Sequence, residues 1–340
     1  MPDTTTARTA RDWLTTLARY REPSTRRSLW ELAATLVPFL GLWALAWGAL
    51  SVSPWLALPF AILNGGFLVR LFIIQHDCGH GSFLKNRRAQ DWLGRVLGVL
   101  TLTPYAVWRH SHSIHHAHHG DLDARGIGDV TTLTVEEYHA RGRWGRLAYR
   151  LYRHPLVLFV LGPGYLFLLQ NRLPLGPMSS GWRYWASAMG TNAMIALILG
   201  LILWVGGLAP VLLVFLPTAL VAATLGVWLF YVQHQFEDTH WSRGEAWQLH
   251  EAALEGSSHY ILPQPLRWLS GNIGIHHVHH LYSRIPFYRL PEVIRDHESL
   301  AEAQRLTIRE SLRSVNLHLW DAVEGKLTSF KDARRRYGMA

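Results

Sequence analysis

The chain has 340 residues, with 33 Lys and Arg against 24 Asp and Glu, 20 histidines and one cysteine, Cys78. A single cysteine excludes an intrachain disulfide and a thiolate metal site, so any metal ligands must be histidines or carboxylates. The net charge of +9, counted with neutral histidines, suits contact with anionic lipid or an acidic protein. We expect no nucleic-acid partner, because the apolar segments described next account for this composition better.

Four stretches are long and apolar enough to cross a membrane, which takes about 20 residues in a helix. Residues 33–50, 186–207 and 208–232 carry no charge. Residues 54–74 contain only Asn64 and Arg70 as strongly polar side chains, and Arg70 lies near one end, where its stem can reach the headgroups. The sequence therefore predicts an all-α integral membrane protein with four transmembrane helices.

The polar N-terminal segment, residues 1–30, is rich in arginine, which the positive-inside rule places in the cytoplasm. The turns at 51–53 and 206–207 carry no charge, so we expect them on the far side. This topology puts both termini and the ends of the second and fourth spans in the cytoplasm. We expect no removable signal peptide and a location in a bacterial inner membrane.

The membrane domain is expected to cover residues 31–295. Within it, residues 92–108 and 156–170 are apolar but short and interrupted, so we predict that both lie at the membrane interface. Residues 296–340 form a cytoplasmic tail. Its apolar spacing predicts an amphipathic helix that contains Leu306, Leu312, Val315 and Leu319.

Three short clusters, each beside an apolar stretch, contain most of the histidines. They comprise or adjoin 12 of the 20 histidines: His76, His80, His110, His112, His115, His116, His118, His119, His276, His277, His279 and His280. Residues three or four positions apart share a helix face, so the members of a cluster can bind one metal ion together. Imidazole suits iron, copper, zinc and nickel. The clusters therefore predict a dimetal site in a helical cap at the cytoplasmic surface of the membrane.

The predicted ligands are the best-spaced members of the clusters and one histidine after the fourth span: His76, His80, His112, His115, His116, His234, His276, His279 and His280. Asp77 and Glu237 stand near ligands in the sequence, and we expect them, with Asn272, to orient imidazole rings from outside. No side chain beyond the metal ligands is predicted to be catalytic.

Three motifs in the chain resemble those of a known protein family. They are His-Asp-Cys-Gly-His at 76–80, Trp-Arg-His-Ser-His-Ser-Ile-His-His at 108–116 and Gly-Asn-Ile-Gly-Ile-His-His-Val-His-His at 271–280. Together they resemble the three histidine boxes of the membrane fatty acid desaturases. Residues 233–241 and 256–260 look like the bacterial and cyanobacterial acyl-lipid branch, and the three residues between His76 and His80 are typical of its Δ12-type members.

This resemblance implies an O2-dependent enzyme that introduces a cis double bond into an acyl chain of a membrane lipid. It also implies two non-haem iron ions held by the nine histidines, and electrons from a separate, small, acidic ferredoxin-like protein. One departure concerns His118 and His119, which stand where relatives often carry Ser, Asn or Thr.

Two other functions compete with this interpretation. Related histidine-box proteins hydroxylate lipids or form ketones on carotenoids, so a di-iron hydroxylase or ketolase is the alternative enzyme. A metal transporter is disfavoured, because a permeation path needs polar ligands near the middle of the spans and these spans contain almost none.

Overall fold

The computed structural model describes residues 12–338 and confirms a mostly helical protein with four long apolar helices. These are α2 (Thr25–Ala49), α3 (Pro54–His80), α9 (Trp182–Gly206) and the run α10 (Leu208–Pro210), η5 (Val211–Phe215) and α11 (Leu216–His234). Each is long and apolar enough to cross a membrane. The first 11 residues of the predicted 1–30 segment lie outside the described residues.

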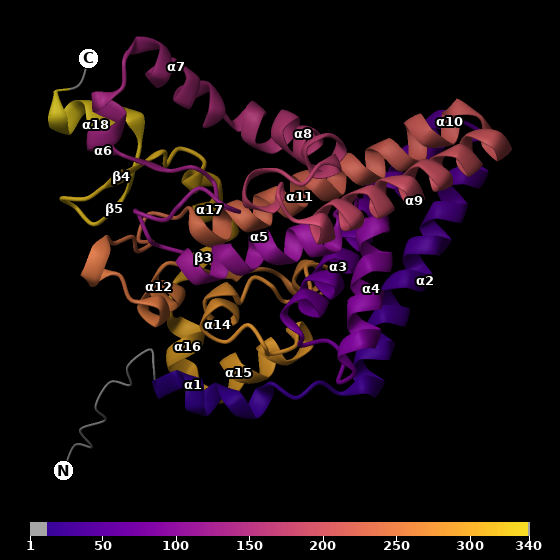
Figure 1. The fold of residues 1–340 in the computed structure, drawn as a ribbon, viewed down its shortest axis with the longest axis horizontal. Coiled ribbons are helices and arrows are strands. Elements are labelled where there is room, and N and C mark those ends of the chain that lie inside the picture. Colours follow the sequence, from indigo (N-terminus) through magenta and orange to yellow (C-terminus); the bar gives the residue numbers. More distant parts are fainter. Residues whose placement is uncertain (1–11, 339–340) are drawn as a thin grey trace.

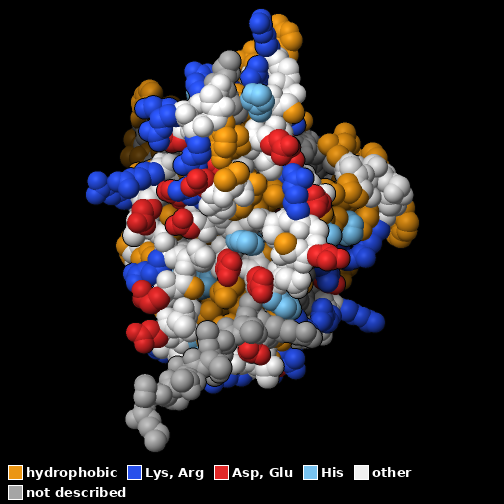
Figure 2. Space-filling view, turned by 90° about the vertical axis from the view of Figure 1, so that its left-hand side faces the viewer, with side chains coloured by type: hydrophobic (Ala, Val, Ile, Leu, Met, Phe, Trp, Pro, Cys, Tyr) orange, Lys and Arg blue, Asp and Glu red, His pale blue; other side chains and the backbone are white. Residues whose placement is uncertain are grey.

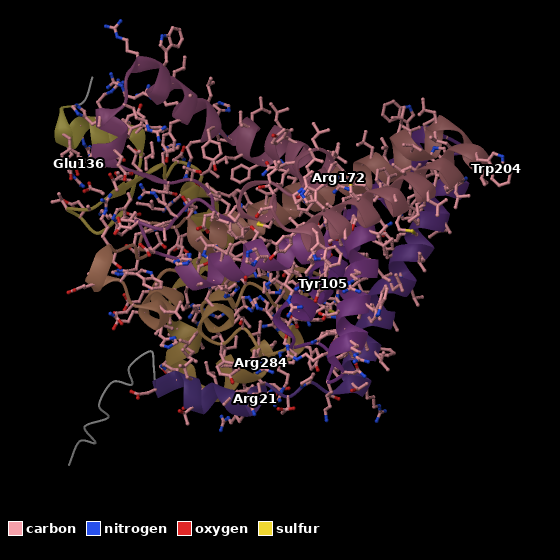
Figure 3. The ribbon with its side chains drawn as sticks, viewed as in Figure 1. Arg21, Tyr105, Glu136, Arg172, Trp204 and Arg284 are labelled. Atoms are coloured by element: carbon pink, nitrogen blue, oxygen red, sulfur yellow. The ribbon has the colours of Figure 1, made fainter. Side chains whose placement is uncertain are left out.

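The four long helices run together toward one end of the molecule (Figure 1). Gly206, at the end of α9, lies against the ring of Trp47 near the end of α2, so the two uncharged turns are neighbours. Large apolar side chains at this end are open to the surroundings. Trp204, labelled in Figure 3, is 83% exposed, as expected of a surface that faces lipid.

Helix α3 is the most buried of the four and continues past the predicted end at residue 74 to His80. Ser53 caps its first turn and Pro54 occupies its first position, while Gly81 ends it with a left-handed φ of 75°. A Cβ atom on Gly65 would lie 2.6 Å from a methyl carbon of Val221, so the glycine allows α11 to approach closely. This packing holds the ends of α3 and α11 side by side.

The predicted interfacial segment 92–108 forms most of a helical hairpin, α4 (Arg87–Leu100) and α5 (Tyr105–His118). Polar side chains hold its tip. The hydroxyl of Thr101 donates to Gln75 of α3 at 2.5 Å, and Arg172 donates to the carbonyl of Leu102, whose φ is 57°. The hairpin thus aligns α5 along α3.

The second predicted interfacial segment, 156–170, belongs to a bent pair of helices. The axis turns by 54° between Arg143–Tyr152 and Val157–Met178, and the pair is either a broken span or a re-entrant loop. The prediction that it stays at the interface therefore remains a prediction.

The polar end of the molecule, called the cap below, is built from short elements. They are β1 (Leu133–Thr134), α6 (Val135–Ala140), η6 (Gly244–Ala246), α12 (Leu249–Glu255), β2 (His259–Ile261), α13 (Gln264–Leu269), α14 (His276–Leu281), η7 (Phe287–Arg289), α15 (Leu290–Asp296), α16 (Glu298–Glu302), β3 (Arg305–Thr307), α17 (Ile308–Ser314), β4 (Leu319–Asp321), β5 (Lys326–Thr328) and α18 (Phe330–Tyr337). The bent pair consists of α7 (Arg143–Tyr152), η2 (Val157–Leu161), α8 (Gly162–Leu168), η3 (Gln170–Arg172) and η4 (Gly176–Met178). Acidic and basic side chains are interspersed over the outer face of the cap (Figure 2).

The amphipathic helix predicted through Leu306 and Leu319 is wrong. Leu306 lies in β3, which pairs in parallel with β2, and Leu319 lies in β4, between β1 and β5. Only α17 between them is helical, and it begins at a capping box formed by Thr307 and Glu310. Pairing with strands far away in the sequence overrides the local helical spacing.

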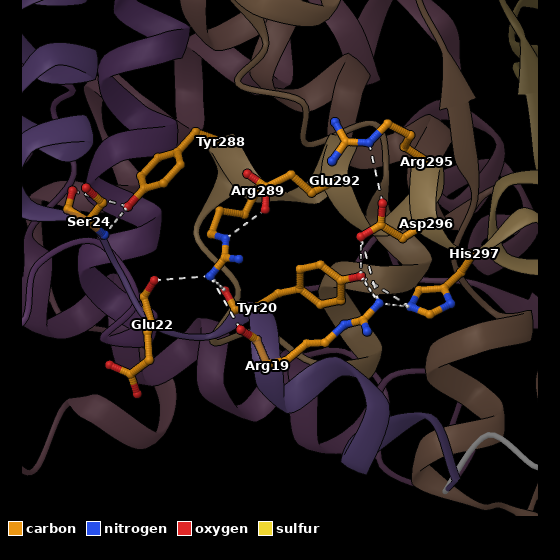
Figure 4. A network of polar contacts seen from close by, with 10 residues as sticks. All are labelled: Arg19, Tyr20, Glu22, Ser24, Tyr288, Arg289, Glu292, Arg295, Asp296 and His297. Atoms are coloured by element: carbon orange, nitrogen blue, oxygen red, sulfur yellow. Dashed lines mark hydrogen bonds and ion pairs between the residues drawn. The ribbon is translucent and has the colours of Figure 1, made fainter.

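The start of the chain is tied to the cap. Helix α1 (Asp12–Leu17) and η1 (Ala18–Tyr20) precede α2, and the hydroxyl of Tyr20 donates to Asp296 at 2.7 Å. Arg289 donates to the carbonyl of Tyr20 at 3.1 Å, and the backbone N–H of Ser24 donates to Tyr288 at 2.9 Å (Figure 4). These bonds fix the point where α2 leaves the cap.

Candidate metal centre

Five histidines from three helices form the first set, which could hold one metal ion. Each contributes a ring nitrogen, and these atoms lie within 4.8 Å of one another: His76 and His80 of α3, His112 and His116 of α5, and His279 of α14. The Nε2 atom of His112 is 3.0 Å from that of His80 and 3.1 Å from that of His116. The continued helix α3 places its two histidines on the face that meets α5.

Four histidines form the second set in the same way: His115 of α5, His234 at the end of α11, and His276 and His280 of α14. The Nε2 atoms of His276 and His234 are 3.1 Å apart, and those of His115 and His280 are 3.3 Å apart. All nine histidines that the sequence predicts as ligands are therefore brought together, in two sets.

The distances between ring nitrogens fit metal binding. Two nitrogens at right angles on one ion, with bonds of about 2.1 Å, lie about 3.0 Å apart. Burial, followed by the charges of neighbouring histidines, lowers the pKa of five of these rings well below 6.5: His112, His116, His276, His279 and His280. These rings are neutral at pH 7, which is the form that binds a metal.

Carboxylates support the rings from outside. The outward nitrogen of His115 is hydrogen-bonded to Asp129, whose side chain is only 8% exposed. On α3, the Nδ1 atom of His76 is 3.4 Å from Asp77, and Asp77 also accepts a 2.7 Å bond from the backbone N–H of Phe287. Asp77 was expected in this position, whereas Asp129 was not, because no helical spacing relates it to His115.

Two predicted supporting residues lie elsewhere. The carboxylate of Glu237 is 62% exposed and pairs with Lys326 at 3.7 Å, because the chain turns outward after α11 ends at His234. The amide of Asn272 donates to the carbonyl of Phe287 at 3.2 Å from a turn with φ of 54°. Within residues 12–338 neither side chain has a hydrogen bond to a histidine of the two sets.

The four remaining histidines of the clusters differ in burial: two lie on the outer side of α5 and two are buried. His110 and His118 stack on Tyr184 and Trp247, with ring centroids 5.2 and 6.4 Å apart, on the outer side of α5. His277 is buried, and its Nε2 donates to the carbonyl of Leu300 at 2.8 Å, away from both sets. His119 is buried beside the second set.

Comparison with known proteins shows to which family the chain belongs. The family model described as fatty acid desaturase matches residues 53–311, which include all nine histidines. The chain belongs to the fatty acid desaturase family. The family prediction from the three motifs is thus confirmed.

Several relatives of this desaturase resemble it over most of their length. It is 45% identical over 315 residues to a fatty acid desaturase of Bacillus subtilis, covering 93% of this chain and 89% of the relative. It is 31% identical to the sn-1 acyl-lipid omega-3 desaturase (ferredoxin) of Synechocystis, covering 88% and 81%. It is 26% identical to the sn-1 oleoyl-lipid 12-desaturase of Anabaena variabilis, covering 82% and 79%. The desaturase is therefore a multi-pass membrane oxidoreductase whose histidine sets are consistent with a dimetal centre.

Proposed function

We propose that this desaturase introduces a cis double bond into an acyl chain of a membrane lipid, with O2 as oxidant and two iron ions held by the nine histidines. One observation carries the proposal: consecutive residues serve different sets. His116 and His279 belong to the first set, and His115 and His280 to the second, with ring centroids of His115 and His116 only 5.6 Å apart. Two ions bound in this way would be neighbours and could act on one O2 molecule.

The side chains around the ions would keep them in place and keep water out. Buried imidazoles bind in the neutral form, and the carboxylates of Asp77 and Asp129 fix ring orientation by accepting from the outward nitrogens. When bound, a pair of iron ions supplies the O2-dependent redox chemistry that no acid or base side chain can perform on an unactivated methylene. The balance is two hydrogen atoms from the substrate, and two electrons and two protons from outside, for each O2 reduced to two waters.

An apolar cavity among the membrane helices suits the acyl chain. Its volume is about 190 Å³, and its lining includes Phe39, Trp43, Leu68, Leu102, Ile198 and Ala219. Leu68 precedes His76 by eight residues, or about 12 Å along the axis of α3. An acyl chain that crosses one leaflet is about 15 Å long. A chain whose distal part fills the cavity can therefore present an inner methylene to the histidine sets.

The branch and the electron donor rest on the relatives and on charge. The Synechocystis relative carries ferredoxin in its name, and the Anabaena relative is a 12-desaturase of oleoyl lipid. We assign this chain to the Δ12-type acyl-lipid branch, with a small acidic ferredoxin-like donor that the net charge of +9 would attract. The site and both termini are assigned to the cytoplasm of a bacterial cell, with the protein in the inner membrane.

The fatty acid profile of a desaturase-deficient bacterial host tests the proposal. The intact chain should produce a new unsaturated fatty acid, which gas chromatography with mass spectrometry identifies and locates. His276→Ala, in the second set, should produce none, whereas His118→Ala, on the outer side of α5, should match the intact chain. An oxygenated fatty acid in place of the unsaturated one would favour the hydroxylase and contradict the proposal.

A further inference from the structure

His119 ends the second histidine cluster and is buried against the second set. It directly follows α5, and the residue is 2% exposed. Its ring centroid is 4.3 Å from that of His234 and 4.9 Å from that of His280. The rings of His234 and His280 are themselves 4.9 Å apart. His119 therefore packs on members of the second set as closely as they pack on each other.

Hydrogen bonding fixes the tautomer of His119. Its Nε2 atom is 2.8 Å from the carbonyl oxygen of Gly256, and a carbonyl only accepts, so Nε2 carries the proton. The lone pair of the neutral ring is then on Nδ1. Within residues 12–338 no donor reaches this buried atom. Metal-binding histidines have this arrangement, in which one nitrogen donates to a carbonyl or carboxylate and the other faces the ion.

The neighbours of His119 also leave its nitrogen available. His119, His115 and Asp129 each offer a ligand atom within 4.8 Å of the others. Asp129 is already hydrogen-bonded to the outward nitrogen of His115, so Nδ1 of His119 is the atom of this group that lacks a partner. The first set has five histidines and the second has four. His119 shares His115 with the second set, but its ligand atom does not lie within 4.8 Å of all four ligand atoms of that set.

We propose that Nδ1 of His119 is a fifth nitrogen ligand of the ion bound by the second set. This inference rests on the dimetal centre of the proposed function and deepens it. It adds a residue of this chain to the nine histidines of the two sets.

Cobalt(II) in place of iron tests the coordination directly. Four-coordinate Co²⁺ absorbs visible light several times more strongly than five-coordinate Co²⁺, so the band intensity reports the number of ligands. In His119→Gln the amide can still donate to Gly256, but the ring nitrogen is lost. With two cobalt ions per chain, this variant should absorb more strongly than the intact protein. The matched control is His118→Gln, an exposed neighbour on α5, whose spectrum should not change.

A second variant, His119→Gly, tests the same ligand by chemical rescue. Added imidazole should fill the space left by the ring and restore the spectrum of the intact protein. Two bound cobalt ions with an unchanged spectrum in His119→Gln, or no response of His119→Gly to imidazole, would overturn the inference. Failure of the intact protein to bind two ions would instead overturn the dimetal centre itself, and the two failures are therefore distinguishable.

Discussion

At the scale of single residues, two carboxylates are hydrogen-bonded to histidine rings of the two sets. Asp129 holds the outward nitrogen of His115 and is almost fully buried, so it fixes both the tautomer and the direction of the ring. Loss of such a partner typically weakens metal binding by about 10- to 100-fold.

We expect Asp129→Ala to show a loss of this size at one of the two sites, measured as iron retained in competition with a chelator. Asp123→Ala removes a carboxylate that is 54% exposed and is the matched control. Equal iron retention by the two variants would show that Asp129 does not support His115.

The partly buried ring of His318 makes the stability of the protein depend on pH. Burial, and then the charges of Arg153 and Arg150, lower the pKa of His318 to about 4, from about 6.5 in the unfolded chain. Between these pH values His318 binds a proton in the unfolded chain but not in the folded protein. The free energy of unfolding therefore falls by up to about 3 kcal/mol as the pH drops from 6.5 toward 4. Above pH 6.5 this group has no effect.

His318→Phe keeps the ring that stacks on Phe330, at 4.2 Å between centroids, and removes the titration. We expect a smaller drop of its unfolding temperature in detergent between pH 7 and pH 5 than for the unchanged protein. An identical drop in both proteins would contradict the assignment to His318.

Eight of the nine histidines that the structure brings together could be selected from the sequence, because the helical spacing of each cluster is local information, and His234 was selected from its place after the fourth span. The side chains around these histidines could not be predicted in the same way. Asp129 reaches His115 only through the loop after α5, Glu237 adjoins the end of α11 but turns outward, and His119 differs from His118 only by its burial. Each of these outcomes depends on how the chain folds back, which spacing along one helix does not report.

At the scale of elements, α2, α3, α9 and α11 were predictable because each is a long apolar run, and the histidines that lengthen α3 follow its helical phase. The structure of the C-terminal tail, residues 296–340, was not predictable, because β3 and β4 form only by pairing with β2 and β1. The cavity among the membrane helices also arises only from their packing.

Ala219 of α11 lines this cavity, and Ala223, one turn further along the helix, does not. Both are buried, so Ala219→Leu and Ala223→Leu should each cost about 1–3 kcal/mol of stability through overpacking. We expect only Ala219→Leu to shift the products toward shorter acyl chains, as measured by gas chromatography at equal iron content. The same product profile for both variants would exclude the cavity as the acyl site.

At the scale of the whole molecule, the uncharged turns and the histidine sets lie at opposite ends of the long helices, which is the arrangement that the assigned topology requires. Exposed positions at each end make it testable, since Val52 is 77% exposed and Val323 is 82% exposed, while Cys78, the only native cysteine, is buried.

In spheroplasts, we expect a membrane-impermeant maleimide to label Val52→Cys directly and Val323→Cys only after lysis. The unchanged protein, with Cys78 buried, is the control for background labelling. The reverse pattern would place the cap outside the cytoplasm.

The most direct test of the central claim is a single turnover with the purified protein carrying two irons, reduced chemically in lipid and then exposed to ¹⁸O2. We expect a new cis double bond in a lipid acyl chain, with no ¹⁸O retained in the lipid and labelled water as the oxygen product. An acyl chain that retains ¹⁸O, or a double bond that forms without O2, would contradict this claim.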